Sequence, residues 1–280
     1  MINLFFGPPG NGKSAVAFML AIDHLKAGGV LATNFKLVNG WASRLAEMRL
    51  ICKLGFVDPV AQAHAYWNRC FFACSPQALT ALSNDFGGKK NPLGTLISGS
   101  VKRKTKSLPE GRGLAIIDEA QIFLNSRHWE HNFPWIEFFT QHRKLGWDVF
   151  LIAHHSDMID KQVRPLLEYE TKLRNLKRVK MPFLPLHFPI SMFSVVSRYA
   201  GLPEQSKSSV HSKRLIPLFL PITRLYDTME VFAFNSVPQG YSRHGADPSA
   251  HSIADSLPLK ISSDKYFESR RRVPVRDRFI

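Results

Sequence analysis

The chain opens on Ile2-Asn3-Leu4-Phe5-Phe6, which leads directly into Gly7-Pro8-Pro9-Gly10-Asn11-Gly12-Lys13-Ser14. The first five residues predict a short buried strand, and the next eight match the phosphate-binding loop G-x-x-x-x-G-K-[ST]. Glycines allow such a loop to curl so that its backbone N–H groups converge on a phosphate. The residues from Ser14 onward predict a helix whose positive N-terminal end points at the same phosphate. This stretch therefore predicts an α/β protein that binds a nucleotide.

The loop also predicts which groups contact the nucleotide. Lys13 can reach the β- and γ-phosphates as a point charge, and Ser14 can place its hydroxyl on Mg²⁺. We therefore expect ATP and Mg²⁺ as cofactors. The candidate nucleotide-binding residues of the loop are Gly7, Pro8, Pro9, Gly10, Asn11, Gly12, Lys13 and Ser14.

A second motif, Leu114-Ala115-Ile116-Ile117-Asp118-Glu119-Ala120, has the pattern of a Walker-B strand. The ends of parallel strands meet at one edge of an open α/β sheet, so Asp118 is expected to lie beside the phosphate loop. There it would hold Mg²⁺ together with Ser14. Glu119 would orient and polarise the water that attacks the γ-phosphate. Alternatively, these acidic residues only cap the following helix.

Further candidates are two arginines and a histidine. Arg143 and Arg164 each end a segment with predicted helical character, and either could stabilise the leaving phosphate across a subunit boundary. Surface arginines are common, so both could equally be ordinary solvated residues. His154 follows the strand Val149–Ala153, where it could sense the γ-phosphate or be a plain loop histidine.

The charge balance indicates polyanionic partners. The 280 residues contain 37 Lys and Arg against 22 Asp and Glu, a formal net charge of +15. Such an excess is typical of proteins that contact nucleic acid or anionic lipid, although a charge run can also be a solvated face. The basic residues cluster at Lys102–Lys106, at Lys172, Arg174, Lys177, Arg178 and Lys180, and at the terminal arginines from Arg270 to Arg278.

Cysteine content and hydropathy limit the other classes. Three cysteines, Cys52, Cys70 and Cys74, do not suggest a disulfide framework. A zinc site that adds His64 is conceivable, but the spacing favours ordinary reduced thiols. Neither a signal peptide nor an apolar run of 18 residues is evident. The uncharged, proline-broken stretch Met181–Ser197 is expected to be irregular, and to bury against the core or rest on a bilayer.

Strands alternate with helices along much of the chain, which predicts a mostly parallel sheet flanked by helices. We expect a P-loop NTPase core over 1–175, a small β-rich appendage over 176–235 and a weakly ordered, basic tail over 236–280. The individual expectations are a first helix that ends at Gly28-Gly29, a strand over Val30–Asn34, helices over Trp41–Leu54, Asn132–Gly146 and Met158–Glu168, and a loop over Asn84–Ser107.

The ordered motifs resemble the zonular occludens toxin-like assembly ATPases of filamentous bacteriophages, within the FtsK–HerA class. The resemblance covers about residues 1–235. Beyond the phosphate loop and the Walker-B strand, it rests on Thr33-Asn34, His142-Arg143-Lys144-Leu145-Gly146-Trp147-Asp148, Met158-Ile159-Asp160-Lys161-Gln162-Val163-Arg164 and Leu225-Tyr226-Asp227-Thr228.

The resemblance implies an ATPase on the cytoplasmic face of the host inner membrane. It implies a motor that drives extrusion of single-stranded phage DNA while coat protein replaces the DNA-binding protein. Phage coat and channel proteins would be partners, and the subunits would form a ring, so that a trans-acting arginine has a neighbour to serve.

Two departures from the family pattern stand out. The family usually has Gln where this chain has His154. Members also usually have a membrane-spanning helix after the Tyr-Asp-Thr element, whereas basic residues follow here, so attachment would come from a partner, from surface contact or from a region absent here. Two other functions stay open: a DNA translocase or helicase unrelated to virion export, and a secreted effector of host-cell junctions.

Overall fold

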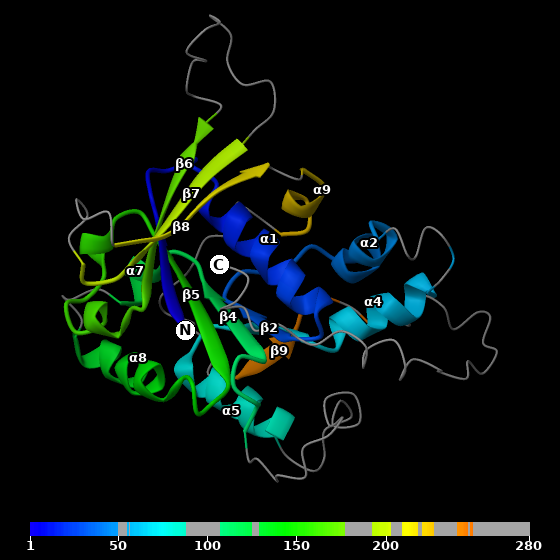
Figure 1. Ribbon diagram of the computed structural model, residues 1–280. Coiled ribbons are helices and arrows are strands. Elements are labelled where there is room, and N and C mark those ends of the chain that lie inside the picture. Colours follow the sequence, from blue (N-terminus) through cyan, green and yellow to red (C-terminus); the bar gives the residue numbers. More distant parts are fainter. Residues whose placement is uncertain are drawn as a thin grey trace, which may run out of the picture.

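The protein forms a mixed, nine-stranded sheet with helices on both faces, as seen in a computed structural model (Figure 1). The structure describes residues 1–49, 55, 57–87, 107–124, 129–176, 192–202, 209–217, 220–226, 240–245 and 247–248. The strands are β1 (Ile2–Phe6), β2 (Val30–Thr33), β3 (Cys70–Ala73), β4 (Gly113–Ile117), β5 (Trp147–Ala153), β6 (Tyr169–Asn175), β7 (Met192–Tyr199), β8 (Val210–Pro217) and β9 (Tyr241–Arg243).

Six strands are parallel, and three antiparallel strands extend the two edges. The order across the sheet is β8-β7-β6-β1-β5-β4-β2-β3-β9. Strands β6, β1, β5, β4, β2 and β3 run in one direction. Strands β7 and β8 add antiparallel pairs beside β6, and β9 adds one beside β3. The predicted α/β class with a mostly parallel sheet is confirmed.

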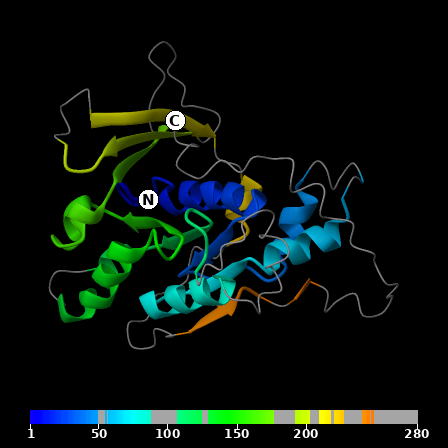
Figure 2. The same ribbon diagram turned by 60° about the horizontal axis from the view of Figure 1, so that its bottom comes forward.

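Helices cover both faces of the sheet, as the continuous apolar strands require. They are α1 (Lys13–Lys26), α2 (Trp41–Glu47), α4 (Pro59–Trp67), α5 (Pro76–Gly87), α7 (Ala120–Phe123), α8 (Trp129–Gln141) and α9 (Leu220–Thr223). Residues of α1, α2, α4 and α9 share one core cluster, and residues of α5, α7 and α8 share the other. In Figure 2, β7 and β8 lie along the side of α1 that faces away from α5 and α8.

Polar pairing inside the sheet joins the central strands to the antiparallel edge. Asn3 of β1 is buried, and its Oδ1 accepts a hydrogen bond of 2.8 Å from the Thr171 hydroxyl of β6. The same hydroxyl lies 2.8 Å from Oγ of Ser197 on β7. Buried polar groups need such partners, so this row ties three strands together.

The expected helix over Met158–Glu168 is wrong. The segment forms two short 3₁₀ turns, η2 (Ser156–Met158) and η3 (Arg164–Leu166), before β6 begins. Pro165 lacks an N–H donor and disfavours helical geometry at the residue before it. Asp160 Oδ1 also accepts from the backbone N–H of Gln162, and this local bond competes with a helix.

Other boundaries differ from expectation. Helix α2 ends at Glu47, and residues 50–54 of its predicted extent lie outside the described part. Helix α8 spans Trp129–Gln141, so Arg143 and Gly146 lie in the turn that follows it, where Gly146 adopts a φ of 78°. Helix α5 includes residues 84–87 of the expected loop, whereas residues 88–106 lie outside the described part.

Three elements around the β9 edge of the sheet were not predicted from the sequence. They are α4, β3 and β9, and β9 pairs with β3 although it lies in the region expected to be a weakly ordered tail. Helix α4 begins at Pro59, and the carboxylate of the preceding Asp58 caps it by accepting from the N–H groups of Val60 and Ala61.

The region after residue 175 is described in part. Residues 192–197 of the apolar stretch Met181–Ser197 belong to β7, and residues 181–191 lie outside the described part. Strands β7 and β8 continue the main sheet edge to edge, while the division into 1–175, 176–235 and 236–280 stays a prediction. Within the described ranges, no helix has both the length and the apolar character needed to cross a bilayer.

Candidate nucleotide-binding site

The candidate site lies at the edge where the parallel strands end. The phosphate loop follows β1, Asn34 follows β2, Asp118 follows β4 and His154 follows β5. Because Phe6 is aligned with Ala153, Gly7 lies beside His154, and its N–H donates to the His154 carbonyl oxygen at 3.2 Å. This convergence at the carboxyl ends of the strands is the one that the two sequence motifs predict.

The phosphate loop is braced by strands β6 and β7. Gly12 has a φ of 73°, and a Cβ at this position would lie 2.4 Å from the Phe193 ring. A Cβ on Gly7 would lie 2.7 Å from the Leu173 carbonyl oxygen, to which Nδ2 of Asn11 donates at 3.2 Å. Glycine is therefore required at both positions by conformation and by space.

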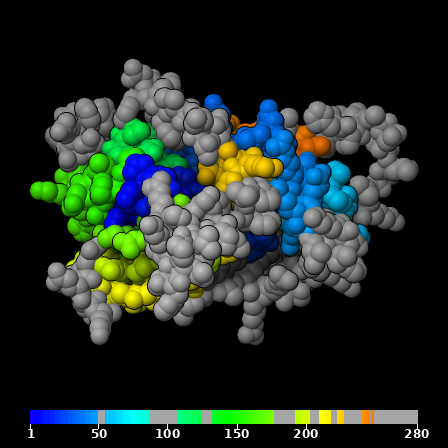
Figure 3. Space-filling model, turned by 90° about the horizontal axis from the view of Figure 1, so that it is seen from above, coloured from blue at the N-terminus to red at the C-terminus, as the bar shows by residue number. Residues whose placement is uncertain are grey.

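The tip of the loop remains accessible. Pro8, Pro9 and Gly10 are exposed, and residues from the blue N-terminal part of the chain reach the surface on the side shown in Figure 3. The same view shows α9, in gold, beside them.

Lys13 lies under the loop, with 7% of its surface exposed. Its Nζ donates to the carbonyl oxygens of Gly7, at 2.8 Å, and Pro8, at 3.3 Å. Burial lowers the pKa of this amine, while the nearby carboxylates of Glu119 and Asp118 act in the opposite direction. The ammonium group is thus held within the loop by carbonyl groups, next to two acidic side chains.

Asp118 and Ser14 are in contact, as the predicted Mg²⁺ site requires. The Ser14 hydroxyl donates to the Asp118 carboxylate, whose Oδ1 also accepts from the Glu119 N–H at 2.9 Å. Burial raises the pKa of Asp118, and these hydrogen bonds partly offset the effect. A hydroxyl and a carboxylate supply hard oxygen ligands, which suit Mg²⁺ that is bound chiefly through phosphates and water.

The described residues form no second metal site such as the conceivable zinc site of cysteines and His64. They contain no group of three or more His, Cys, Asp and Glu side chains able to hold a metal ion. Cys70 and Cys74 are buried cysteines in the reduced form, and burial raises the pKa of Cys70. Cys52 of the possible zinc set lies outside the described part.

Glu119 adopts a backbone conformation unusual for its residue type. Its φ of 50° is the only positive φ at a non-glycine residue in the part of the chain that the structure describes. Such conformations are costly and occur often at functional sites. Although Glu119 precedes α7, its side chain makes no capping hydrogen bond; it accepts from the Gln121 side-chain amide instead.

His154 lies between the lysine and the glutamate. Its Nδ1 is 3.4 Å from Nζ of Lys13, and its Nε2 is 3.4 Å from Oε2 of Glu119. A neutral imidazole that carries its proton on Nε2 accepts from the lysine and donates to the glutamate at the same time. The histidine therefore connects the phosphate loop to the Walker-B motif.

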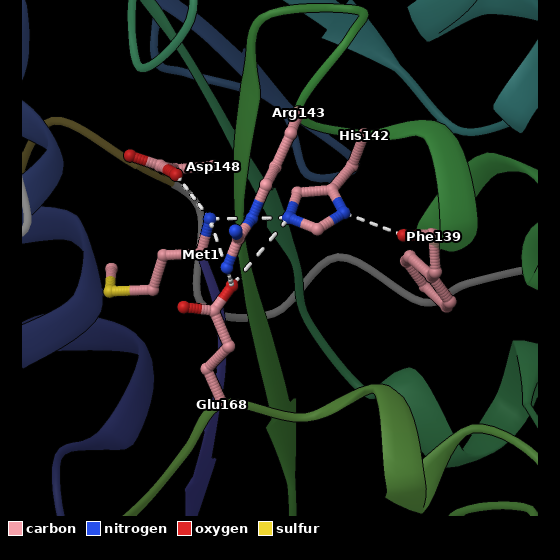
Figure 4. Close-up of polar contacts among 6 residues, drawn as sticks. All are labelled: Met1, Phe139, His142, Arg143, Asp148 and Glu168. Carbon is pink, nitrogen blue, oxygen red and sulfur yellow. Dashed lines mark hydrogen bonds and ion pairs between the residues drawn. The ribbon is translucent and has the colours of Figure 1, made fainter.

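Arg143 lies near the amino ends of the parallel strands, whereas the phosphate loop lies at their carboxyl ends. Its Nη2 forms a 2.7 Å ion pair with Oε1 of Glu168, which precedes β6 (Figure 4). The same carboxylate lies 3.5 Å from the Met1 amine, and that amine lies 2.5 Å from Oδ1 of Asp148. This cluster is separated from Gly7 by the whole of β1, five residues at about 3.3 Å each.

Arg164 is engaged in its own loop. Its Nη1 lies 3.1 Å from Oδ1 of Asp157, and its Nε donates to the Ile159 carbonyl oxygen at 3.0 Å. Its Nη2 also donates to the Asp157 carbonyl oxygen at 2.6 Å. Thus the structure brings together Lys13, Ser14, Asp118, Glu119 and His154, whereas both arginines bind residues outside this group.

Sequence reasoning assigned no role to Asn34, Gln121 or Tyr226. Asn34 hydrogen-bonds the backbone of Asp118, and Gln121 binds Glu119. Burial, with a smaller contribution from Asp118, raises the pKa of Tyr226 to about 12. Asn34 and Tyr226 both belong to short motifs that carry the family resemblance, and Asn34 is also a polar residue at the end of an apolar strand; for Gln121, the sequence offered no signal.

Comparison with known proteins supports the resemblance drawn from the motifs. The family model described as zonular occludens toxin matches residues 85–219. The Gene 1 protein of Enterobacteria phage I2-2 is 37% identical in an alignment of 247 residues, and the match covers 81% of this chain and 56% of the relative. The Gene 1 protein of Enterobacteria phage fd is 25% identical in an alignment of 238 residues, and the match covers 82% of this chain and 59% of the relative.

Among the solved structures that are similar is that of the N-terminal domain of zonular occludens toxin from Neisseria meningitidis. It is 16% identical, with a TM-score of 0.42, and the match covers 81% of this chain and 98% of the other. The chain spans less than three fifths of the length of the two phage relatives. The chain is thus similar to the filamentous-phage Gene 1 proteins, and its resemblance to the zonular occludens toxin family is confirmed.

Proposed function

We propose that this chain, a relative of the filamentous-phage Gene 1 proteins, is an ATP-hydrolysing motor that drives assembly and extrusion of filamentous phage. The observation that carries the proposal is the convergence of Lys13, Ser14, Asp118 and Glu119 at one edge of the sheet. These groups match the parts of a P-loop ATPase: a phosphate-binding lysine, a pair of metal ligands and a carboxylate for water.

In the proposed reaction, the loop N–H groups and Lys13 bind the β- and γ-phosphates. Ser14 and Asp118 would hold Mg²⁺, which would supply charge neutralisation on the phosphate oxygens. Glu119 orients the attacking water in line with the bond that breaks, and His154 aligns Glu119. Because a water-activating carboxylate favours hydrolysis, ATP hydrolysis fits the site better than phosphoryl transfer to another substrate.

We further propose that the subunits form a ring. Neither arginine candidate contacts Lys13 within the subunit, since Arg143 pairs with Glu168 and Arg164 pairs with Asp157. An arginine that reaches the γ-phosphate from a neighbouring subunit would make hydrolysis depend on assembly. Arg143 remains one candidate for such an arginine, because its side chain is half exposed and lies at the end of the strands opposite the phosphate loop, where a neighbouring subunit could be contacted.

The partners we propose are single-stranded phage DNA, directly or through its binding protein, and phage coat and channel proteins. A basic surface on β6 and β8 supports contact with a polyanion. Lys172, Val196 and Lys213 are directly opposite one another across three strands, so their side chains share a face, and both lysines are exposed. Arg174, two residues beyond Lys172 on the same face, is exposed as well.

We place the protein on the cytoplasmic face of the host inner membrane, where the basic surface could also contact anionic lipid. Co-sedimentation with anionic and neutral vesicles at low and high salt tests this part. Preference for anionic vesicles that disappears at high salt is expected. Equal binding to both vesicle types would remove the electrostatic contribution, and absence of binding would contradict surface attachment.

The function is tested by phage production from cells that carry Lys13→Ala as the only copy. We expect loss of extruded virions with normal protein levels, while Lys26→Ala, a lysine at the other end of α1, serves as the matched control. Production at the wild-type level from Lys13→Ala would contradict the proposal. Co-purification with coat or channel proteins separates it from a general DNA translocase, and protein found outside cells would point to a secreted effector.

A further inference from the structure

A side chain from the neighbouring strand fixes the residue that carries the Walker-B carboxylate. Nδ2 of Asn34 donates to the Asp118 carbonyl oxygen at 2.9 Å, and Oδ1 of Asn34 accepts from the Asp118 N–H at 2.8 Å. Asn34 directly follows β2 and is only 2% exposed. Its carboxamide therefore acts as a substitute peptide group for Asp118.

This pairing extends the sheet into the site. The backbone pairing of β2 with β4 ends where Thr33 is aligned with Ile116, and the Asn34 N–H donates to the Ile116 carbonyl oxygen at 3.2 Å. Beyond this point, the Asn34 side chain replaces the missing strand. Asp118 is consequently held by hydrogen bonds on both of its flanking peptide groups, although it lies past the end of β4.

Fixing these two peptide groups sets the direction of two acidic side chains. The Asp118 N–H and carbonyl belong to the peptides on either side of its Cα. Holding both peptides fixes the position of the Cα and the direction of the Cα–Cβ bond, from which the side chain reaches Ser14. The second of these peptides also contains the Glu119 N–H, which donates to Oδ1 of Asp118. The backbone of Glu119 continues from this peptide with a φ of 50°, and in this conformation its carboxylate contacts His154 and Gln121.

We propose that Asn34 is a positioning residue for Mg²⁺ binding by Asp118 and for water activation by Glu119. The inference rests on the proposed function, because it assigns Asn34 a role in that same site. Asn34 acts only through the Asp118 backbone. Residues that orient metal ligands from behind typically contribute 10- to 100-fold in metal affinity or activity when they are replaced.

Two variants separate this role from simple packing. Asn34→Asp keeps the size and the acceptor for the Asp118 N–H but places a carboxylate oxygen against the Asp118 carbonyl. Asn34→Ala removes both hydrogen bonds. The control is Ser83→Ala, because Ser83 is equally buried and also joins two backbone groups, the Leu145 carbonyl and the Leu108 N–H, away from the site.

The experiment measures ADP binding by calorimetry with and without Mg²⁺, the kcat of ATP hydrolysis and the melting temperature. For both Asn34 variants we expect the Mg²⁺ concentration at half-saturation to rise about 10- to 100-fold and kcat to fall by a similar factor. ADP binding without Mg²⁺ should stay within about 3-fold of wild type, because the phosphate loop is untouched; this is less than 1 kcal/mol. Ser83→Ala should leave the Mg²⁺ requirement at the wild-type value.

Two results would overturn the inference. One is an unchanged Mg²⁺ requirement in both variants. The other is a loss of ADP affinity without Mg²⁺ as large as the loss with Mg²⁺, together with a lower melting temperature, which would indicate a structural role only. If Asn34→Ala does not fold, Asn34→Asp alone decides between these outcomes. Absence of ATP hydrolysis by the wild-type protein would instead contradict the proposed function, while the Mg²⁺ titration of ADP binding would still test Asn34.

Discussion

Nε2 of His154 lies 3.4 Å from Oε2 of Glu119, although the two are 35 positions apart in sequence, with the whole of α8 and β5 between them. The opposite ring nitrogen faces Lys13. The imidazole is thus the side chain through which a change at the phosphate-binding lysine reaches the carboxylate proposed to activate water. A movement of Lys13 toward a phosphate would change its contact with the same imidazole that contacts Glu119.

Replacing this histidine is expected to lower turnover more than nucleotide affinity. His154→Ala removes one of the side chains that contact Glu119 and leaves the hydrogen bond from Gln121. The kcat should therefore fall on the order of 10²-fold, the cost of misplacing a reacting group by about 1 Å. His154→Gln, which restores a hydrogen-bonding side chain, should lose less. Steady-state kinetics with a separate ATP-binding measurement check this; equal kcat in both variants and wild type would remove His154 from the mechanism.

Lys13 and Glu119 are expected to give opposite phenotypes. Lys13→Ala should bind ATP weakly because the loop loses its point charge. Glu119→Gln should retain ATP while kcat falls about 10²- to 10⁴-fold, the usual contribution of a general base. Filter binding of labelled ATP, measured alongside phosphate release, distinguishes the two. Hydrolysis by Glu119→Gln at a near wild-type rate would show that another group activates the water.

The arginine candidates are tested by mixing subunits. If either is a true finger, Arg143→Ala or Arg164→Ala should lower kcat by about 10³-fold or more and leave ATP affinity nearly intact. Specific activity should also rise with protein concentration. Each arginine variant, inactive alone, should regain partial activity when mixed with inactive Glu119→Gln protein, because some interfaces then pair an intact glutamate with a neighbour's intact arginine.

A structural role for these arginines predicts a different result. Arg143 pairs with Glu168 and Arg164 with Asp157, so their replacement would then lower the melting temperature without loss of kcat in the folded protein. A mixture that stays inactive while subunits demonstrably exchange would reject the trans mechanism for that arginine.

A buried histidine, His244, predicts acid sensitivity at the far edge of the sheet. It directly follows β9 and is only 3% exposed. Its Nε2 lies 3.0 Å from the Thr33 hydroxyl, and its Nδ1 accepts from the Leu37 N–H at 3.3 Å. Burial lowers the pKa of His244 to about 4 from an ordinary value of 6.5.

Because the folded-state pKa is the lower one, the stabilising contribution of His244 is complete above pH 6.5 and is lost as the pH falls toward 4. The difference of about 2.5 pKa units corresponds to about 3 kcal/mol. His142, whose pKa burial also lowers, acts in the same direction. Urea unfolding between about pH 7 and 4 should therefore show a smaller loss of stability for His244→Gln than for wild type. Replacement of the exposed His155 by Gln is the control, and an unchanged pH dependence in His244→Gln would contradict this prediction.

The sequence determined the parts of the fold whose signals are local. The phosphate loop, the buried strand before it and the helix after it are contiguous, and Asp118 follows a strand that is apolar throughout. Because strand ends meet at one edge of a parallel sheet, placing Lys13 near Asp118 needed only these two motifs. The α/β class followed from the alternation of strands and helices.

The tertiary structure decided what depends on contacts between distant segments. Strand β9 pairs with β3 although the two lie far apart along the chain, and the polar sequence of β9 has no apolar pattern of its own. Asn34 meets Asp118 only because β2 and β4 are neighbours in the sheet, and His154 meets Lys13 and Glu119 only because β5 lies between β1 and β4. Sequence periodicity reports which faces of an element are buried, whereas strand order and side-chain partners are fixed by the packing of the whole chain.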